Sequence, residues 1–411
     1  MAGPPALPRP SVVLGVAGGI AAYKACELLR QLTESGHDVR VVPTRAALEF
    51  VGAPTWAALS GHPVTASAWE DVHEVPHVAI GRAADLVVVA PATADLLARA
   101  AHGLADDLLT DVLLTARCPV VLAPAMHTEM WEHPATQANV VTLRERGVLV
   151  LEPATGRLTG ADSGRGRLPE PDELARICRR VLARGARGPD LTGRRVLVSA
   201  GGTREHLDPV RFLGNRSSGR QGYALARAAV ARGAEVVLVS AAAELPDPAG
   251  AKVVRVTSAV ELADAVLSEG AASDVVVMAA AVADYRPTSR LATKRKKTDQ
   301  LTVELVQNPD VLLELGRRRS AGQVLVGFAA ETGDDSGDVL AHGRAKLARK
   351  GCDLLVVNEV GEAGHPTGFE GDSNAATVLA ADGSSYDVPL GSKDALADAV
   401  LDLVRVRLPP R

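Results

Sequence analysis

The chain has 411 residues, of which 47% are hydrophobic, 23% are charged and 3% are aromatic, and its formal net charge is -4. This length is large for one hydrophobic core, so we expect two domains. The balanced charge favours neither a nucleic acid nor an anionic membrane as a partner, and no apolar run approaches the ~20 residues that span a bilayer. The four cysteines are far apart, which excludes a CxxC ligand pair and a dense disulfide framework. With no secretory signal at the start, we expect a cytoplasmic protein.

The first half alternates apolar runs with helical patterns. Each apolar run ends at a glycine or a proline and is followed by a segment with helical periodicity. This alternation predicts an α/β domain with a doubly wound, Rossmann-like parallel sheet, whose ligands bind beyond the carboxyl ends of the strands. The strands expected in this half are 11–17, 38–42, 85–90 and 120–123.

Candidate ligand-binding residues follow these strands. Gly18 and Gly19 separate the first strand from a helix, an arrangement that presents backbone N–H groups to a phosphate. The glycine spacing does not match G-x-G-x-x-G, so a mononucleotide is favoured over a dinucleotide. A threonine at such a turn is more often a helix cap than a ligand. The other candidates at these turns are Thr44, Ala92, Thr93 and Met126.

The stretch 124–131, Pro-Ala-Met-His-Thr-Glu-Met-Trp, is unusual in a chain with only four methionines and three tryptophans. Adaptable side chains beside His127 suit a flat organic ligand that must be covered and released. The alternative interpretation is that Met126, Met130 and Trp131 are ordinary core residues at the end of a strand.

Four motifs of this half resemble, in order, the flavin-dependent phosphopantothenoylcysteine decarboxylases. They are Gly-Gly-Ile-Ala-Ala-Tyr-Lys, the helix that His77 opens, Ala-Pro-Ala-Thr-Ala-Asp-Leu and Pro-Ala-Met-x-x-x-Met-Trp. The resemblance implies FMN at the strand ends, a trimer with the flavin near a subunit interface, and His77 as the active-site histidine. It also implies that FMN oxidises the substrate thiol so that CO₂ can leave.

Two positions depart from that family's pattern. His127 stands where many relatives have an asparagine that contacts the substrate carboxylate, and an imidazole N–H can donate there in its place. Segment 156–168 resembles the substrate-covering flap, but Gly160 stands where many relatives have a cysteine proton donor. These departures keep open an alternative, in which the first half is a flavin-binding regulatory module without decarboxylase activity.

We place the domain boundary near residue 190, because the glycine-rich segment 183–193 ends a helical pattern. Domain 1–190 would hold FMN and domain 191–411 would bind a nucleotide. Strands expected at 195–200, 234–240, 274–279 and 323–328 repeat the doubly wound pattern. The long insertion 205–218 carries several arginines, which predicts an anion-binding loop.

The second half resembles phosphopantothenate–cysteine ligase in long strings, such as Asp-Pro-Val-Arg-Phe-x-x-Asn-x-Ser-Ser-Gly and Ala-Ala-Ala-Val-Ala-Asp-Tyr. The resemblance implies the substrates 4'-phosphopantothenate, L-cysteine and CTP with Mg²⁺, and an acyl-cytidylate intermediate from which the cysteine amine displaces CMP. Asn215 would bind this intermediate and Arg211 would hold its anionic groups, with Asn215 and Lys294 in catalytic roles. The further nucleotide-site residues that it implies are Ala280, Asp284, Pro309, Asp310, Val311, Leu312, Phe328, Lys346 and Lys350.

Lys346 and Lys350 are four residues apart, so they share one helix face and can both reach a polyphosphate. No metal ligand follows from the sequence. A competing class for this half is an NAD(P)-dependent oxidoreductase, which the absence of G-x-G-x-x-G disfavours. The family also implies ligase dimers, and dimers combined with trimers of the first half would build a larger homo-oligomer such as a dodecamer.

Overall fold

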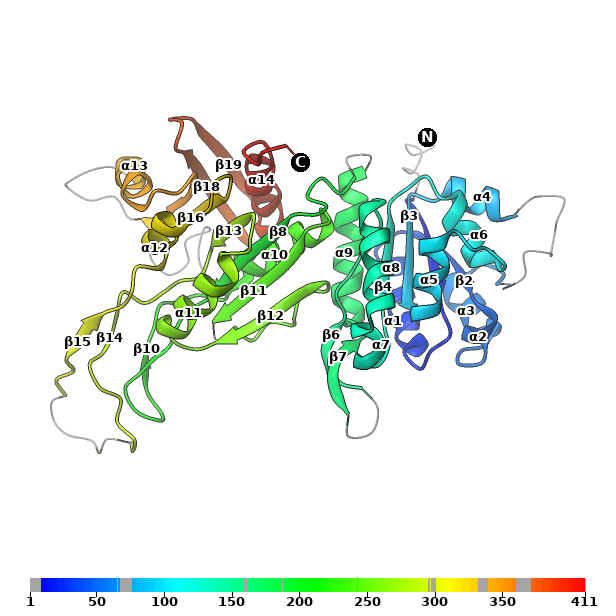
Figure 1. The fold of residues 1–411 in the computed structure, drawn as a ribbon, viewed down its shortest axis with the longest axis horizontal. Helices are drawn as coiled ribbons and strands as arrows, with labels where there is room; N and C mark the ends of the chain where they lie inside the picture. Colours follow the sequence, from blue (N-terminus) through cyan, green and yellow to red (C-terminus); the bar gives the residue numbers. More distant parts are fainter. Residues whose placement is uncertain are drawn as a thin grey trace, which may run out of the picture. The chain divides into compact units, whose positions relative to one another are not determined.

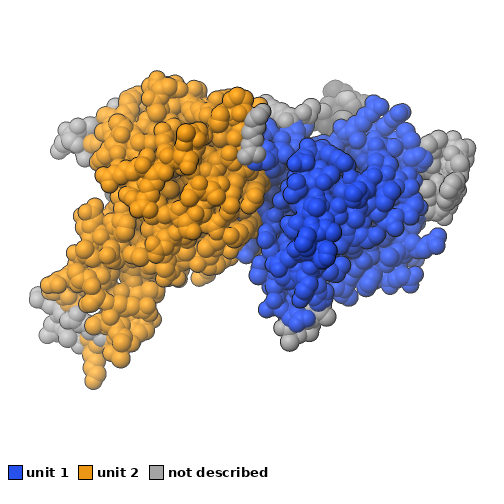
Figure 2. Space-filling model, viewed as in Figure 1, with its two compact units in different colours: residues 1–193, 230–233, 247–250 blue, residues 194–229, 234–246, 251–411 orange. Residues whose placement is uncertain are grey.

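The structure is a computed structural model that describes residues 9–64, 66, 76–158, 162–185, 188–241, 243–294, 296, 301–331, 339–359 and 371–410. The chain forms two compact units, which Figure 2 shows in different colours. Unit 1 comprises residues 1–193, 230–233 and 247–250, and unit 2 comprises residues 194–229, 234–246 and 251–411. Both are α/β units built on parallel strands, which confirms the predicted fold class (Figure 1).

Unit 1 contains a five-stranded parallel sheet in the order β2-β1-β3-β4-β5. The central strand β3 is Leu-Val-Val-Val-Ala-Pro-Ala, and all seven residues are buried. A parallel strand that is covered on both faces favours such a continuous apolar run. The strands of this unit are β1 Ser11–Val16, β2 Asp38–Pro43, β3 Leu86–Ala92, β4 Val120–Pro124, β5 Leu149–Val150 and the antiparallel pair β6 Ala154–Arg157 and β7 Ser163–Arg167.

Helices cover both faces of this sheet. Helices α1 and α9 pack against each other, while α5 packs against α6 and α8, and α4 packs against α6. Connections between parallel strands are as a rule right-handed. Because the chain runs from β1 to β2 in one direction along the sheet and from β3 to β5 in the other, this rule places the helices of the two halves on opposite faces. The helices are α1 Ala22–Glu34, α2 Arg45–Leu48, α3 Ala53–Ser60, α4 Pro76–Ala83, α5 Ala94–His102, α6 Leu108–Thr115, α7 Thr128–Glu132, α8 Pro134–Glu145 and α9 Pro171–Arg184.

Unit 2 contains an eight-stranded sheet in the order β12-β11-β8-β13-β16-β17-β18-β19. Its first six strands are parallel, and their chain order corresponds to the doubly wound order 3-2-1-4-5-6. The strands of the sheet are β8 Arg195–Gly201, β11 Glu235–Ala241, β12 Ala251–Val256, β13 Val275–Met278, β16 Val324–Glu331, β17 Leu354–Glu359, β18 Ser373–Ala380 and β19 Ser385–Ser392.

The last two strands depart from the all-parallel expectation. β18 pairs antiparallel with β17 and with β19. The β18–β19 hairpin closes at Gly383, whose φ is +89°, and the Asp382 side chain accepts a hydrogen bond from the backbone N–H of Ser384 (2.9 Å). Asp-Gly is a turn sequence that permits this conformation, so the hairpin signal was present in the chain.

Helices α11, α12 and α13 form one layer of unit 2, and α10 belongs to the crossover that runs in the opposite direction. Two short antiparallel pairs lie outside the large sheet: β9 Glu205–His206 with β10 Phe212–Leu213, and β14 Tyr285–Pro287 with β15 Leu305–Gln307. The expected loop 205–218 therefore contains a small hairpin. The helices of this unit are α10 Arg220–Ala231, α11 Ala259–Gly270, α12 Val311–Arg318, α13 Val339–Lys350 and α14 Lys393–Arg405.

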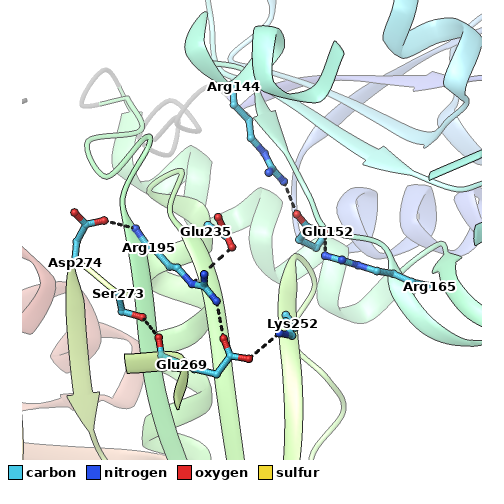
Figure 3. A network of polar contacts seen from close by, with 9 residues as sticks. All are labelled: Arg144, Glu152, Arg165, Arg195, Glu235, Lys252, Glu269, Ser273 and Asp274. Atoms are coloured by element: carbon cyan, nitrogen blue, oxygen red, sulfur yellow. Dashed lines mark hydrogen bonds and ion pairs between the residues drawn. The ribbon is translucent and has the colours of Figure 1, made fainter. Parts of the chain in front are cut away.

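Glu269 joins two strands of unit 2 to the end of α11. Its carboxylate accepts hydrogen bonds from Lys252 (2.8 Å) and Arg195 (2.5 Å), as Figure 3 shows. The hydrogen bond from Lys252 lowers the pKa of Glu269 below its ordinary value of 4.5, and Arg195 lowers it further against the opposing effect of burial. The ionised carboxylate is therefore favoured in the folded unit.

A first prediction concerns pH. A carboxyl group with a lowered pKa in the folded state stabilises the protein above its unfolded-state pKa, and this contribution is lost as the pH falls through the folded-state value. Glu269→Gln should lower the free energy of unfolding by about 0.5–1 kcal/mol at pH 7, and the difference from wild type should shrink below pH 4.5. Urea denaturation of wild type and variant at several pH values measures this difference in the free energy of unfolding. Glu235→Gln is the control, because its contact with Arg195 is 3.8 Å long and exposed. A constant difference between pH 7 and pH 3.5 would contradict the account.

A second prediction compares two neighbouring residues of α7. Trp131 is 1% exposed and lies in the core of unit 1, as the core interpretation of this stretch predicted, whereas Met130 is 48% exposed. Trp131→Ala should cost about 3–5 kcal/mol of stability through the cavity that it leaves. Met130→Ala should change the stability by less than about 0.5 kcal/mol. Denaturant-dependent hydrogen exchange of peptides from β3 and β4 measures the two effects, and equal effects would be inconsistent with the packing.

Candidate active sites

Backbone hydrogen bonds bring the turns after four strands of unit 1 together at one edge of its sheet. The N–H of Thr44 donates to the carbonyl of Val16 (2.9 Å), and the N–H of Ala17 donates to the carbonyl of Pro91 (3.1 Å). The N–H of Ala125 donates to the carbonyl of Ala92 (3.1 Å). The predicted residues Gly18, Gly19, Thr44, Ala92, Thr93 and Met126 all lie in or next to these turns.

This edge fits the phosphate end of a flavin nucleotide. Strand order 2-1-3-4-5 reverses direction between β1 and β3, the switch point at which ligands of doubly wound sheets bind. Helix α1 begins there, and its N-cap residue Ala21 provides no side-chain hydrogen bond to the first turn. A Cβ at Gly18 would lie 2.4 Å from the Cβ of Ala46, so only glycine permits this turn. A Cβ at Gly19 would meet nothing closer than 4.0 Å, so space is open on that side.

Thr44 and Thr93 both cap helices. The Oγ1 of Thr44 accepts from the N–H of Ala47 (3.2 Å), and the Oγ1 of Thr93 accepts from the N–H of Leu96 (3.3 Å). A hydroxyl that accepts a backbone N–H still carries a proton to donate. Capping is therefore compatible with ligand binding at both positions, and it orients the two hydroxyls at the edge.

The β6–β7 hairpin lies against the loop that carries Met126 and His127. The N–H of Met126 donates to the carbonyl of Gly166 (2.9 Å), and a Cβ at Gly166 would lie 2.0 Å from the carbonyl oxygen of Met126. A Cβ at Gly164 would lie 2.3 Å from the Oγ1 of Thr128. The predicted flap therefore starts on the candidate site, and close approach requires glycine at positions 164 and 166. Gly160 lies outside the described residues.

Glu152 anchors this hairpin. Its carboxylate accepts a hydrogen bond from Arg144 (2.9 Å) and another from Arg165 of β7, and its side chain is only 11% exposed (Figure 3). The guanidinium of Arg165 also lies over the Trp131 ring, 6.0 Å from the ring centroid. One mostly buried carboxylate thus connects the hairpin to α8 and to the core beneath the 126–131 loop.

His77 is not brought to the same edge within one chain. It lies in the first turn of α4, and its carbonyl accepts a hydrogen bond from the hydroxyl of Thr115 (2.9 Å). Figure 1 shows α4 at the opposite end of unit 1 from α7 and the β6–β7 hairpin. The Nδ1 of His77 is buried and has no hydrogen-bond partner among the described residues. An unsatisfied imidazole nitrogen is costly unless a ligand or another chain meets it.

Unit 2 has a cavity of about 580 Å³ at its own switch point, between β8 and β13. Two segments form much of its wall: residues 214–222, which lead into the first turn of α10, and residues 279–284, which follow β13. The rest of the wall comes from residues of β16, β17, β18, α13 and α14. Five of the predicted ligase residues line it: Asn215, Ala280, Asp284, Phe328 and Lys346.

Buried polar side chains hold the 279–284 turn in this shape. The hydroxyl of Thr203 accepts from the N–H of Ala283 (3.0 Å), and the amide of Asn308 donates to the carbonyl of Ala283 (2.9 Å). The side-chain amide of Asn215 donates to the carbonyl of Val282 (3.0 Å), which fixes Asn215 against this turn. Neither Thr203 nor Asn308 was assigned a site role from the sequence, because each acts only through the backbone groups of this turn.

Other predicted ligase residues lie outside this cavity. The N-cap of α12 is Asp310, whose carboxylate is paired with Lys350, so Pro309, Asp310, Val311, Leu312 and Lys350 cluster at the start of that helix. Burial would raise the pKa of Asp310, but the hydrogen bonds from Lys350 and from the N–H of Leu313 outweigh it and lower that pKa. Arg211 pairs with the buried Asp208 (2.5 Å) and lines a separate cavity of about 290 Å³. Lys294 is exposed in the segment after β14 and is not part of the described lining of the larger cavity.

Four lining residues of the larger cavity were missed by sequence reasoning: Gln221, Asn358, Asn374 and Lys393. Asn374 and Lys393 lie on or directly after the antiparallel strands that the sequence analysis did not predict. Their side chains reach the cavity only because β18 folds back beside β17. Asn358 lies near the end of β17, and a polar residue after the apolar run 354–357 was the one signal that could have identified it.

The described part of the chain contains neither a cluster of metal ligands nor a helix that could span a membrane. No group of three or more histidine, cysteine or acidic side chains is arranged there to hold a metal ion. None of its helices is both long and apolar enough to cross a membrane.

Comparison with known proteins agrees with this architecture. A model of the family described as DNA/pantothenate metabolism flavoprotein C-terminal domain matches residues 191–407, and a Flavoprotein model matches residues 5–182. The Coenzyme A biosynthesis bifunctional protein CoaBC of Mycobacterium tuberculosis (strain ATCC 25618 / H37Rv) is 60% identical over 402 residues, 96% of each chain. The protein of that name from Bacillus subtilis (strain 168) is 42% identical over 93% of each chain. A crystal structure of the C-terminal domain of such a protein is 36% identical, with a TM-score of 0.45 over 53% of this chain and 97% of that chain.

The folds and the family models define a two-part enzyme, in which a flavoprotein unit is followed by a unit with a polar, cation-lined cavity. The chain belongs to the family of bifunctional coenzyme A biosynthesis proteins. Its two parts are accordingly a flavoprotein decarboxylase and a ligase of coenzyme A biosynthesis.

A third prediction tests the hairpin anchor. Arg165→Ala removes a charge-assisted hydrogen bond to a mostly buried carboxylate, an interaction worth about 1.5–3 kcal/mol. Amide exchange in β6 and β7 should accelerate about tenfold, measured by hydrogen exchange and mass spectrometry. The matched control is Arg167→Ala on the same strand, because its partner Glu170 is 49% exposed and the pair should contribute less than about 1 kcal/mol. Equal acceleration in both variants would rule out Glu152 as the specific anchor.

Proposed function

We propose that the chain converts 4'-phosphopantothenate into 4'-phosphopantetheine in two steps. Domain 191–411 activates the carboxylate with CTP and Mg²⁺ and joins it to L-cysteine. Domain 1–190 then decarboxylates 4'-phosphopantothenoylcysteine with the help of FMN. The observation that supports this best is that each unit has predicted residues at the switch point of its own doubly wound sheet: six in the turns of unit 1 and five in the cavity of unit 2. The free state of all four cysteines is compatible with a cytoplasmic location.

In the first domain, Gly18, Gly19 and the first turn of α1 would hold the FMN phosphate, with hydroxyl donors from Thr44 and Thr93. Ala92 and Met126 would contact the flat ring system. FMN, when bound, supplies the two-electron oxidation of the thiol that allows the carboxylate to leave. His127 would donate an N–H to that carboxylate. The β6–β7 hairpin would cover the substrate and exclude water.

His77 would act in a flavin site that a second copy of the chain completes. The place of α4 at the opposite end of unit 1 from the β6–β7 hairpin supports this arrangement, as does the lack of a partner for the buried Nδ1 of His77 among the described residues. A histidine that acts in the flavin site of a neighbouring copy requires an oligomer. The trimer of the first domain that the family resemblance implies would meet this requirement. The proposed assembly is a homo-oligomer with additional dimer contacts through the second domain, and a dodecamer satisfies both symmetries.

In the second domain, Asn215 would hold the acyl-cytidylate against the 279–284 turn. Asp284, Ala280 and Phe328 would line the nucleotide site, and Lys346 would neutralise phosphate charge together with Mg²⁺ carried by the nucleotide. Lys350 and residues 309–312 would complete the site at the start of α12. Arg211 and Lys294 lie outside the lining of the larger cavity. They would reach the intermediate if their segments moved or if a partner subunit supplied them. The cysteine amine attacks the acyl carbon, the bond to the CMP oxygen breaks, and the amine loses its proton.

The alternative for the first domain is a flavin-binding module without catalysis. Only His127, which replaces an asparagine of the family motif, favours it in the described residues. The two functions differ in whether CO₂ is released from the cysteine adduct.

A fourth prediction tests both assignments together. Purified protein is incubated with 4'-phosphopantothenate, cysteine, CTP and Mg²⁺, and the products are followed by mass spectrometry. His77→Asn should retain bound flavin but slow decarboxylation at least about 100-fold, because proton transfer by a positioned histidine is worth that much or more, and the cysteine adduct should accumulate. Asn215→Asp should prevent formation of the adduct, since a carboxylate would repel the anionic intermediate.

Supplied 4'-phosphopantothenoylcysteine is the control, because Asn215→Asp must still decarboxylate it. If wild-type protein itself accumulates the adduct, the first domain is the non-catalytic module. If wild type forms no adduct, the ligase assignment fails.

A further inference from the structure

Arg255, on the edge strand β12, connects three segments that lie behind the wall of the unit 2 cavity. Its Nη1 donates to the hydroxyl of Tyr223 in α10 (2.8 Å) and to the Oγ of Ser240 in β11 (3.2 Å). The same nitrogen donates to the carbonyl of Ala243, which follows β11 (3.2 Å). A charged residue on an edge strand is typically solvated, whereas this guanidinium group is bonded to the interior of the unit.

The two hydroxyls that Arg255 meets are completely buried. Tyr223 and Ser240 are both 0% exposed, and their oxygens lie 2.9 Å apart, so one hydroxyl donates to the other. Each oxygen can accept a further hydrogen bond, which Arg255 supplies. Hydrogen bonds from a cationic donor are stronger than those from a neutral one, and burial of the acceptors strengthens them again. The hydroxyl end of Tyr223 is therefore fixed from both β11 and β12.

The groups that Arg255 holds support the cavity wall segment 214–222 at Gly219. The N–H of Tyr223 donates to the carbonyl of Gly219 (3.1 Å), at the start of α10. Gly219 has a φ of +75°, and a Cβ there would lie 3.0 Å from the Cβ of Ala243. Tyr223 and Ala243 thus meet the same wall residue, one through a hydrogen bond and the other through packing. Loss of their common donor would release Gly219 on both sides.

The wall segment 214–222 has little room to move without displacing Asn215. A Cβ at Gly222 would lie 2.4 Å from the Cβ of Ala200, and a Cβ at Gly202 would lie 2.8 Å from the carbonyl oxygen of Asn215. The side-chain amide of Asn215 also donates to the carbonyl of Val282 (3.0 Å). A shift at the middle of so closely packed a segment is transmitted to its ends. Misplacement of a group that holds a reacting molecule, by as little as about 1 Å, lowers the reaction rate strongly.

We propose that Arg255 is a positioning residue of the ligase reaction, which sets the place of segment 214–222, and thereby of Asn215, through Tyr223 and Ala243. Arg255 does not line the cavity itself, so it acts on the reaction through these neighbours. The inference rests on the proposed ligase function of unit 2 for the reaction that is affected. The effect on the segment itself follows from the hydrogen bonds alone.

The fifth prediction compares Arg255→Met with Arg255→Lys and with the control Lys252→Met. Lys252 lies on the same strand and donates to Glu269 (2.8 Å) at the end of α11, but neither residue lines the cavity. Both methionine variants therefore remove a charge-assisted hydrogen bond of β12, and only one of these bonds supports the wall segment. The measurements are the kcat of adduct formation and the KM for CTP.

Arg255→Met should lower kcat about tenfold or more, with the KM for CTP changed less than about threefold, because most predicted nucleotide-site residues lie on other segments. Arg255→Lys should recover part of the lost kcat, since an ammonium group can still donate to one of the hydroxyls. Lys252→Met should leave both constants within about twofold of wild type. Equal losses of kcat in Arg255→Met and Lys252→Met would overturn the proposal, because Arg255 would then only stabilise the edge strand.

Hydrogen exchange without substrates tests the position of the segment independently of the reaction. Amides in peptides that cover residues 214–224 should exchange about tenfold faster in Arg255→Met and at the wild-type rate in Lys252→Met. Unchanged exchange in Arg255→Met would overturn the proposal. If wild type forms no adduct, the ligase assignment fails, but acceleration confined to this segment would still support the positioning of segment 214–222 by Arg255.

Tyr223→Phe keeps the proposal testable if Arg255→Met does not fold. It removes one acceptor of Arg255 while the ring keeps filling the core. It should lower kcat by about threefold or more and accelerate exchange in the same peptides. If neither quantity changes in Tyr223→Phe, the hydroxyl does not transmit the effect of Arg255 and the proposal fails.

Discussion

Hydrogen bonds between parallel strands that are buried on both faces organise the two units. Such strands cannot be joined by tight turns, so each must be followed by a helix that crosses back over the sheet. Every loop that follows a strand then lies at the same edge, and reversal of the winding direction opens a gap there. In unit 1 the gap lies between β1 and β3, and in unit 2 between β8 and β13. Both candidate sites depend on this single constraint.

The two edges carry different chemistry on the same scaffold. Unit 1 presents a glycine turn, a helix start and two capping hydroxyls, which are neutral donors suited to a cofactor that stays bound. Unit 2 presents four cations around a cavity, which suits substrates whose phosphate charge changes during reaction. In both units a helix or loop packs so closely against the sheet edge that only glycine fits. A Cβ at Gly222 would lie 2.4 Å from the Cβ of Ala200, and a Cβ at Gly18 would lie 2.4 Å from the Cβ of Ala46. Glycine at these positions lets helix and loop approach the sheet.

Buried polar groups link each site to the rest of its unit. Glu152 connects the hairpin of unit 1 with α8, and Asn308 connects the turn of Asp284 with the start of α12. Each is a residue whose removal would leave a neighbouring polar group unpaired, which is more costly than the loss of the hydrogen bond itself. His77 is the exception, since its buried Nδ1 meets no partner in the described part of the chain. The proposed role of His77 therefore depends on a group that the described part of one copy does not supply.

The sequence by itself determined eight strands of the two large sheets, their alternation with helices, and the loops in which ligands were expected to bind, because apolar runs, glycines and prolines are local signals. Gly18, Gly19, Thr93 and Asn215 could be identified from it, since each directly follows a recognisable strand or lies in a specific motif. Lys393 and Asn374 could not, because they are distant in sequence from the predicted motifs and reach the cavity only through the pairing of β18 with β17. The tertiary structure also decided that Arg211 and His77 lie apart from the residues with which they were grouped. A motif indicates which chemistry a residue can perform. Which residues come together in one site depends on contacts between segments that are distant along the chain.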